Sequence, residues 1–303
     1  MDKRVAEAEE CMKKAAKALK TSLIGLKFKP DFDSAASEYE RAAVCYRNAS
    51  KLTECRDVYL KAAECHESNG VLFHAAKCKE AAALVCKDLG EMDKAKQLME
   101  TAADIYAESG TPDTSAMALD KAAKFFEPVD PDKAIEIYKK ALLLVQETDR
   151  SRLASEFLDR LTRLYLRQER YADAVANIEQ EVDMYIEVRE ASKVGRLTTG
   201  LVLVQLMRGD AVAADKSYQA SFKCDGFERT DDAAIIGSLI TAYESGDEEK
   251  FTQCLNRPQM KAMDNEFLRL MKKLKCPKSI GSQSGGKEGH GGGDENEDED
   301  DFK

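Results

Sequence analysis

The chain has 303 residues, a formal net charge of −10, no Trp and only 6 Pro. Strong β-formers are sparse outside helical patterns, so this composition favours an all-α protein and argues against an all-β fold. The acidic balance gives no reason to expect a nucleic-acid partner, no run approaches the length of a membrane span, and the first residues lack the apolar centre of a signal peptide. We therefore expect a cytoplasmic protein whose nine cysteines are reduced thiols.

Residues 2–20 form an amphipathic pattern typical of a helix, and the segment after it is both apolar and basic. Gly25 and Pro30 block a regular continuation of the helix. Two interpretations of this loop are open: it packs on its neighbours, or it contacts the interfacial region of a membrane. The candidate membrane-contact residues are Leu23, Ile24, Leu26, Lys27, Phe28 and Lys29.

From Tyr39 to Val145 the chain repeats one helical pattern six times, about every 20 residues. A small residue, a large residue, two small residues and a large residue follow one another at the spacing of one α-helix face. The paired small residues are Ala42/Ala43, Ala62/Ala63, Ala82/Ala83, Ala102/Ala103 and Ala122/Ala123, and the leading small residues are Ala35, Cys55, Ala75, Ala95, Ser115 and Ala134. Small residues let neighbouring helices approach closely, and the large residues fill the space between them.

Short breaks that contain Gly or Pro separate these helices. They are Asn69-Gly70, Leu89-Gly90, Gly110-Thr111-Pro112 and Pro128-Val129-Asp130-Pro131. A helix of roughly 16 residues and a short turn, repeated, predicts antiparallel helices stacked as a right-handed α-solenoid. The repeat places Cys45, Cys55, Cys65 and Cys86 on its packed face, so we expect core cysteines there.

The helical pattern continues beyond residue 145 to a break at Cys224-Asp225-Gly226. Residues 194–206 are apolar all round, which predicts a buried helix. Shorter helices near 231–245, 247–256 and 259–274 are expected to close the solenoid as a compact bundle. We thus divide the chain into a solenoid over 1–225, a C-terminal helical bundle over 226–275, and a disordered Gly-rich acidic tail over 276–303.

Two apparent chemical motifs have simpler explanations. Residues 281–287 match most of a phosphate-binding loop, but Glu288 stands where Ser or Thr should ligate Mg²⁺, and no strand precedes the segment. Zinc ligands could be sought in Cys65, His66, His74 and Cys78. However, the repeat already places both of these cysteines on the packed face, so we predict no metal site. No catalytic motif is present, and we expect neither a cofactor nor an enzyme.

Arginines are concentrated between residues 150 and 170. This segment contains 6 Arg and only 3 acidic residues, although the chain as a whole is acidic. The stripe consists of Arg152, Arg160, Arg163 and Arg167, with Arg170 just beyond. It is either a solvated helix face with local ion pairs or a docking surface for an acidic helical partner. Solenoids offer extended faces of this kind.

Four segments together resemble one known family. Residues 21–39, 72–77, 110–119 and 129–134 are similar, in this order, to the soluble NSF attachment proteins, and most like the gamma type. The resemblance spans residue 2 to about 275 and involves loop residues that generic repeats do not share. It implies a TPR-like array, although the Trp-Leu-Gly-Tyr signature of tetratricopeptide repeats is missing.

The resemblance implies an adaptor in vesicle fusion and membrane trafficking, peripherally associated with membranes. Family members bind the four-helix SNARE bundle of syntaxin-type complexes along the helical array and recruit the hexameric ATPase NSF through the C-terminal end. The SNARE-binding candidates here are Arg160, Arg163 and Arg167. The NSF-binding candidates are Glu244, Asp247, Glu248, Glu249, Asp298, Glu299, Asp300, Asp301 and Phe302. The alternative is a general α-solenoid interaction scaffold unrelated to NSF.

Overall fold

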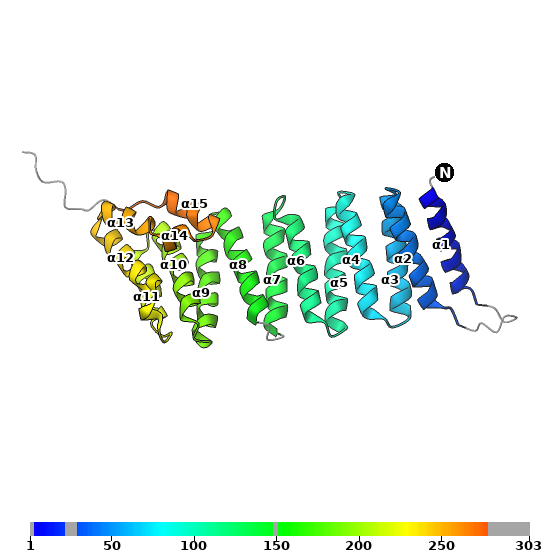
Figure 1. The fold of residues 1–303 in the computed structure, drawn as a ribbon, viewed down its shortest axis with the longest axis horizontal. Helices are drawn as coiled ribbons and strands as arrows, with labels where there is room; N and C mark the ends of the chain where they lie inside the picture. Colours follow the sequence, from blue (N-terminus) through cyan, green and yellow to red (C-terminus); the bar gives the residue numbers. More distant parts are fainter. Residues whose placement is uncertain (1–2, 22–28, 148–150, 278–303) are drawn as a thin grey trace, which may run out of the picture.

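The computed structural model describes residues 3–21, 29–147 and 151–277, and within them it contains fifteen α-helices, one 3-10 helix and no strand. The helices follow one another along an elongated array, with α1 at one end (Figure 1). The bounds are α1 Lys3–Leu19, α2 Phe32–Asn48, α3 Leu52–Ser68, α4 Leu72–Asp88, α5 Met92–Glu108, α6 Pro112–Phe126, α7 Pro131–Glu147, α8 Ser151–Arg167, α9 Tyr171–Glu187, α10 Ala191–Met207, α11 Ala211–Ser221, η1 Phe227–Arg229, α12 Asp231–Ser245, α13 Glu248–Leu255, α14 Pro258–Lys261 and α15 Asn265–Lys273. The predicted α-solenoid is confirmed.

The repeat follows from a fixed helix length and a three-residue connection. Helices α2 to α5 each have 17 residues and are joined by turns of three. Gly70 and Gly90 hold the turn with a positive φ of 72° and 79°, a conformation that glycine adopts without steric cost. Ser50, Glu169 and Arg189 take the same conformation, with φ between 57° and 59°. The turn geometry therefore continues where the sequence carries no glycine.

The small residues predicted at the waist of each helix are buried. Every paired alanine from Ala42 to Ala123 has an exposed fraction of 0 or 1%, and the leading small residues from Ala35 to Ala134 behave in the same way. Large side chains such as Tyr106, Phe126 and Tyr138 fill the space beside them and are at most 2% exposed. Burying one such side chain stabilises the fold by roughly 1.5–3 kcal/mol.

The predicted core cysteines are only partly confirmed. Cys55, Cys65 and Cys86 are buried, as the repeat predicts, whereas Cys45 is only partly buried. Ile105 and Phe125, at the corresponding positions further along the array, are also only partly buried, so this position lies at the border of the packed face.

Ion pairs show that the array has two layers. Lys96 of α5 lies 3.3 Å from Glu136 of α7, and Arg160 of α8 lies 3.3 Å from Asp120 of α6. Further pairs join α5 to α7 through Lys133–Asp93 and Lys140–Asp104, α4 to α6 through Lys121–Glu80, and the start of α9 to α7 through Arg170–Asp132. Helices two apart in sequence are thus neighbours in space, so α3, α5, α7 and α9 form an odd layer and α4, α6 and α8 an even layer.

The C-terminal end differs from the prediction at one helix. The expected helix near 259–274 is divided into α14 and α15, because Asp264 has an extended backbone and caps α15 by accepting a hydrogen bond from Glu266 N at 3.1 Å. The buried helix expected at 194–206 is confirmed as α10. From the end of the array α15 turns back onto α8 and α10 (Figure 1). At Gly200 of α10 an added Cβ would lie 2.8 Å from the ring of Phe267, so this helix contact requires glycine or a displaced ring.

Candidate functional site

Arginines of the predicted stripe lie on α8, and each of the three SNARE-binding candidates pairs with acids of this same chain. Arg160 lies 3.3 Å from Asp120 of α6. Arg163 lies within ion-pair distance of Asp159 on its own helix and 3.2 Å from Asp264. Their side chains are 28% and 39% exposed. These two arginines are therefore neutralised within the molecule and only partly accessible to a partner.

Arg167 completes the stripe and connects it to the C-terminal bundle. Its Nε donates a hydrogen bond of 2.8 Å to Glu266, a residue of α15 that is only 6% exposed. Arg269 donates to the same carboxylate at 3.1 Å. The hydrogen bond to Glu266 raises the pKa of the Arg167 guanidinium above its usual value. We call the four residues Arg163, Arg167, Asp264 and Glu266 the α8–α15 latch, because they join the even layer to the last helix.

The two remaining arginines of the stripe are more peripheral. Arg152 is 93% exposed at its side chain and lies 3.7 Å from Glu156, one turn further along α8. Arg170 contacts Asp173 at 2.8 Å and Asp132 at 3.1 Å. Exposed pairs of this kind contribute little to stability, typically about 0–1 kcal/mol.

Sequence patterns did not reveal the acids of the latch. Asp264 and Glu266 lie about 100 residues from α8, and the predicted helix over 259–274 ran straight through them. A signal was present, because Asp264 is followed by Asn265, Glu266 and an apolar run, an order typical of a helix start.

Apolar side chains on the even layer also escaped the sequence analysis. Phe73 of α4 is 40% exposed and Met117 of α6 is 56% exposed. Phe73 lines a surface hollow together with Lys77, Leu84 and Lys121 from α4 and α6. The even layer thus presents apolar and basic side chains next to one another, on the same layer as the arginines of α8.

The predicted NSF-binding acids of the C-terminal bundle lie around the start of α13. Asp247 caps this helix and accepts a hydrogen bond of 3.0 Å from Lys250 N. Glu244, Glu248 and Glu249 are exposed. Hydrogen bonds from Lys250 hold the pKa of Asp247 below its usual value. The second part of the predicted NSF-binding set, Asp298, Glu299, Asp300, Asp301 and Phe302, lies outside the described residues.

The predicted membrane loop is described only at its two ends. Lys29 is exposed, whereas Leu23, Ile24, Leu26, Lys27 and Phe28 lie outside the described residues. The ends of the loop are held together, because Asp31 N donates a hydrogen bond of 3.1 Å to Ala18 O. In the part of the chain that the structure describes, no helix is long and apolar enough to cross a membrane.

Comparisons with known proteins agree on one family. The family model described as "Soluble NSF attachment protein, SNAP" matches residues 6–277. The chain is 24% identical over 272 residues to a gamma-soluble NSF attachment protein of Dictyostelium discoideum, covering 90% of this chain and 83% of the relative. It is 26% identical over 269 residues to a gamma-soluble NSF attachment protein of Arabidopsis thaliana, covering 88% and 91%.

Solved structures of low sequence identity also match. A signal transduction ATPase of Pyrococcus horikoshii with a tetratricopeptide repeat sensor is 16% identical, with a TM-score of 0.44, covering 90% of this chain and 44% of that one. The PilF protein of Pseudomonas aeruginosa is also 16% identical, with a TM-score of 0.34, covering 80% and 99%.

Proposed function

Because this chain belongs to the soluble NSF attachment protein family, we propose that it binds SNARE complexes and presents them to the ATPase NSF for disassembly. It is an NSF attachment adaptor and not an enzyme, so the free energy of disassembly comes from the ATPase. The observation that carries the proposal is the family match over residues 6–277, which extends through the solenoid and the C-terminal bundle. We assign this activity to vesicle fusion and membrane trafficking.

One pull-down experiment decides between this function and a general scaffold. Immobilised SNARE complex is incubated with NSF and a non-hydrolysable ATP analogue, with and without the full-length protein. We expect NSF to be retained only when the protein is present. If the protein binds neither component, or binds one without bringing the other, the adaptor function is wrong and the scaffold alternative takes its place.

For the SNARE bundle we propose the even layer as the docking face, centred on Arg160, Arg163 and Arg167. Support comes from the arginines of α8 and from the exposed Phe73 of α4 and Met117 of α6 in the same layer. A long helical bundle needs an extended surface, and a solenoid layer offers one. The arginines already form ion pairs with acids of this chain, so a carboxylate of the partner has to compete with these acids. This competition favours specificity of binding over high affinity.

The test of this face has to distinguish loss of a direct SNARE contact from disruption of the α8–α15 latch. Reversal of the three arginines to Glu should weaken SNARE binding and flatten its dependence on salt. The matched control combines Asp264→Asn with Glu266→Gln, which removes the acids of the latch and leaves the arginines in place. Docking predicts that this control binds SNARE complexes at least as well as the parent. If both variants lose binding equally, the arginines act through the latch and the docking face lies elsewhere.

For NSF we propose a two-part contact. The exposed acids Glu244, Glu248 and Glu249, with Asp247, speed the encounter with a basic surface, and Phe302 of the tail adds an apolar anchor among Asp298, Glu299, Asp300 and Asp301. Replacing Phe302 by Ser leaves the net charge unchanged. We expect normal SNARE binding with impaired stimulation of ATP hydrolysis. If Phe302→Ser stimulates the ATPase fully, Phe302 is not an anchor, and the four acids from Glu244 to Glu249 remain as the proposed NSF contact.

For the membrane we propose that the loop after α1 inserts Leu23, Ile24, Leu26 and Phe28 at the interface while Lys27 and Lys29 meet anionic headgroups. Each apolar side chain supplies roughly 1.5–3 kcal/mol when fully buried, so the contact is weak and acts only once a SNARE complex tethers the protein. The variant Ile24→Ser/Phe28→Ser should slow disassembly on liposomes and leave soluble complexes unaffected. Equal effects on both substrates would contradict a membrane role.

A further inference from the structure

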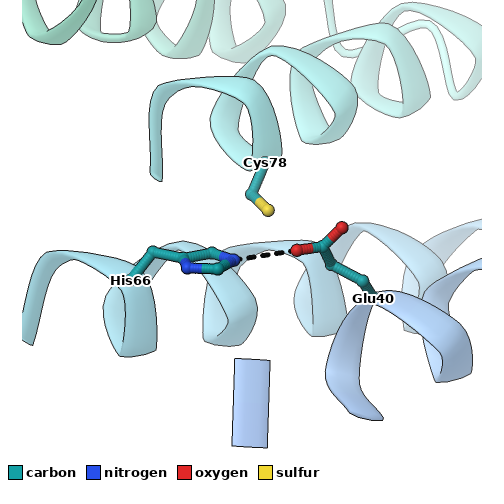
Figure 2. Close-up of side chains that lie close together, drawn as sticks. All are labelled: Glu40, His66 and Cys78. Atoms are coloured by element: carbon teal, nitrogen blue, oxygen red, sulfur yellow. Dashed lines mark hydrogen bonds and ion pairs between the residues drawn. The ribbon is translucent and has the colours of Figure 1, made fainter. Parts of the chain in front are cut away.

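Three helices bring an imidazole, a thiol and a carboxylate to one point near the N-terminal end of the array. Glu40 comes from α2, His66 from α3 and Cys78 from α4, and their ligand atoms all lie within 4.8 Å of one another. His66 Nε2 lies 2.8 Å from Glu40 Oε1. Figure 2 shows the Cys78 sulfur pointing towards the space between the His66 ring and the Glu40 carboxylate. No sequence motif marks this group, because each residue belongs to a different helix.

The repeat provides an internal comparison for this group. Forty residues further on, the corresponding positions are Glu80, Tyr106 and Ala118. There the Tyr106 hydroxyl donates a hydrogen bond of 3.0 Å to Glu80, and Ala118 offers no ligand atom. The packing of the three helices thus requires only a carboxylate and an aromatic side chain that forms a hydrogen bond to it. In the earlier copy, His and Cys stand in the places of Tyr and Ala, and both of these replacements are zinc ligands.

Burial makes this group costly without a further partner. His66 is 6% exposed, and its Nδ1 is buried without a hydrogen-bond partner. Cys78 is 3% exposed, and burial together with the Glu40 charge raises its pKa to about 12. A cation between the three side chains would be bound by His66 Nε2, the nitrogen that faces Glu40, and would remove the repulsion that keeps the Cys78 thiol protonated.

We propose that Glu40, His66 and Cys78 bind a zinc ion that joins α2, α3 and α4. Zinc takes sulfur at about 2.3 Å and nitrogen or oxygen at about 2.0–2.2 Å, so ligand atoms in a tetrahedral site lie about 3.3–3.8 Å apart. Small side-chain rotations bring the three atoms from their present separations into this range. On binding, the proton that His66 Nε2 shares with Glu40 moves to Nδ1, which leaves Nε2 free to bind the metal. The Cys78 S–H bond breaks, its proton leaves for solvent, and thiolate and carboxylate together neutralise the two charges of Zn²⁺.

The site has a path to solvent and room for a fourth ligand. The Glu40 side chain is 38% exposed, and both Glu40 and His66 line a surface pocket with His74 and Lys77. A water molecule from this pocket can complete the tetrahedron. The positive charges of Lys77 and Arg41 in the same pocket repel a metal cation. The affinity for zinc therefore depends on the negative charge of the Cys78 thiolate. The earlier prediction of no metal site considered Cys65, His66, His74 and Cys78 but not Glu40, which lies 26 residues away from His66.

Cobalt is the direct probe for such a site, because thiolate-bound Co²⁺ absorbs through a charge-transfer band. The full-length chain is purified without a polyhistidine tag, reduced, stripped of metal and titrated with Co²⁺ and then Zn²⁺. We expect one equivalent of Co²⁺ to produce the band, release of about one proton per metal from a thiol, and displacement by Zn²⁺. We also expect Zn²⁺ to raise the melting temperature, since it binds only the folded chain.

Two cysteine variants separate this site from other thiols. Cys78→Ala introduces the residue type found forty positions later, so the variant should fold normally. It should lose the Co²⁺ band and bind Zn²⁺ about 100-fold more weakly or worse, because loss of even an outer-shell partner weakens metal binding 10–100-fold. Cys86→Ala is the matched control on the same helix, also buried, and should keep the band. Absence of the band in the parent, a Cys78→Ala variant that still shows it, or its equal loss in Cys86→Ala would each overturn the zinc site.

Discussion

Glu181 of α9 is a buried carboxyl whose ionisation works against the fold. It is 4% exposed and accepts a hydrogen bond of 2.7 Å from Ser155. Burial, its largest cause, raises the pKa of Glu181 from 4.5 to about 7. Asp159 of α8 adds a smaller repulsion and Lys193 of α10 a smaller attraction. The Ser155 hydroxyl also lies 2.9 Å from the Tyr185 hydroxyl.

The sign of the resulting pH dependence follows from which state binds the proton more tightly. Below pH 4.5 Glu181 is protonated in both states and has no effect on stability. As pH rises from 4.5 to about 7, the unfolded chain loses this proton while the folded chain keeps it, so stability falls. Each pH unit in this window corresponds to about 1.36 kcal/mol, and the full effect is at most about 3 kcal/mol. Above pH 7 the penalty is complete and constant.

The substitution Glu181→Gln removes the ionisation and keeps an oxygen that accepts the Ser155 hydrogen bond. We expect the variant to be more stable than the parent at pH 8, by up to about 3 kcal/mol, and equally stable at pH 4.5. The assay is urea unfolding followed by circular dichroism at both pH values, comparing the midpoints of the two proteins. A matched control is Glu179→Gln, two residues earlier on the same helix, where burial also raises the pKa but no large shift is present. If Glu181→Gln gains no more at pH 8 than at pH 4.5, the carboxyl is already hydrated and the reasoning fails.

Three further changes test the packing. Gly200→Leu should displace Phe267 and release α15 from α10, seen as faster amide exchange in α15 with α2–α7 unchanged; unchanged exchange would contradict the close contact. Tyr138→Phe removes the 2.6 Å hydrogen bond to Glu127 and should cost about 1 kcal/mol in urea unfolding; a cost below the error of the fit would show that water replaces the hydroxyl. Glu266→Ala should cost about 1 kcal/mol, because Arg167 and Arg269 are half exposed and regain water; a loss several times larger would mean that α15 detaches.

The sequence predicted most of the array because its repeat depends on local spacing. Ala62 and Ala63, or Ala102 and Ala103, recur at a period that only a helix face explains, and each is at most 1% exposed. The extent of α10 was likewise predicted, since an apolar surface all round can only be buried. These features need no knowledge of which helix packs on which.

Long-range pairs were beyond the same reasoning. The stripe from Arg160 to Arg167 was visible as excess charge, but its partners Asp120 and Glu266 lie 40 and 99 residues away. Glu40 was likewise not singled out in the sequence, because its partners His66 and Cys78 lie on two other helices. Charge patterns along a chain show which side chains exist, whereas their pairing depends on helix stacking, which a single sequence does not give.

The two-layer arrangement decides on which broad side of the molecule a helix lies. Helices α4, α6 and α8 lie on one side and α5, α7 and α9 on the other, whatever their separation in sequence. The last described helix, α15, packs on α8 and α10. A rigid partner that follows the face of α8 therefore meets the arginines of α8 beside the acids at the start of α15. A partner on the odd side has to bend around an edge to reach both.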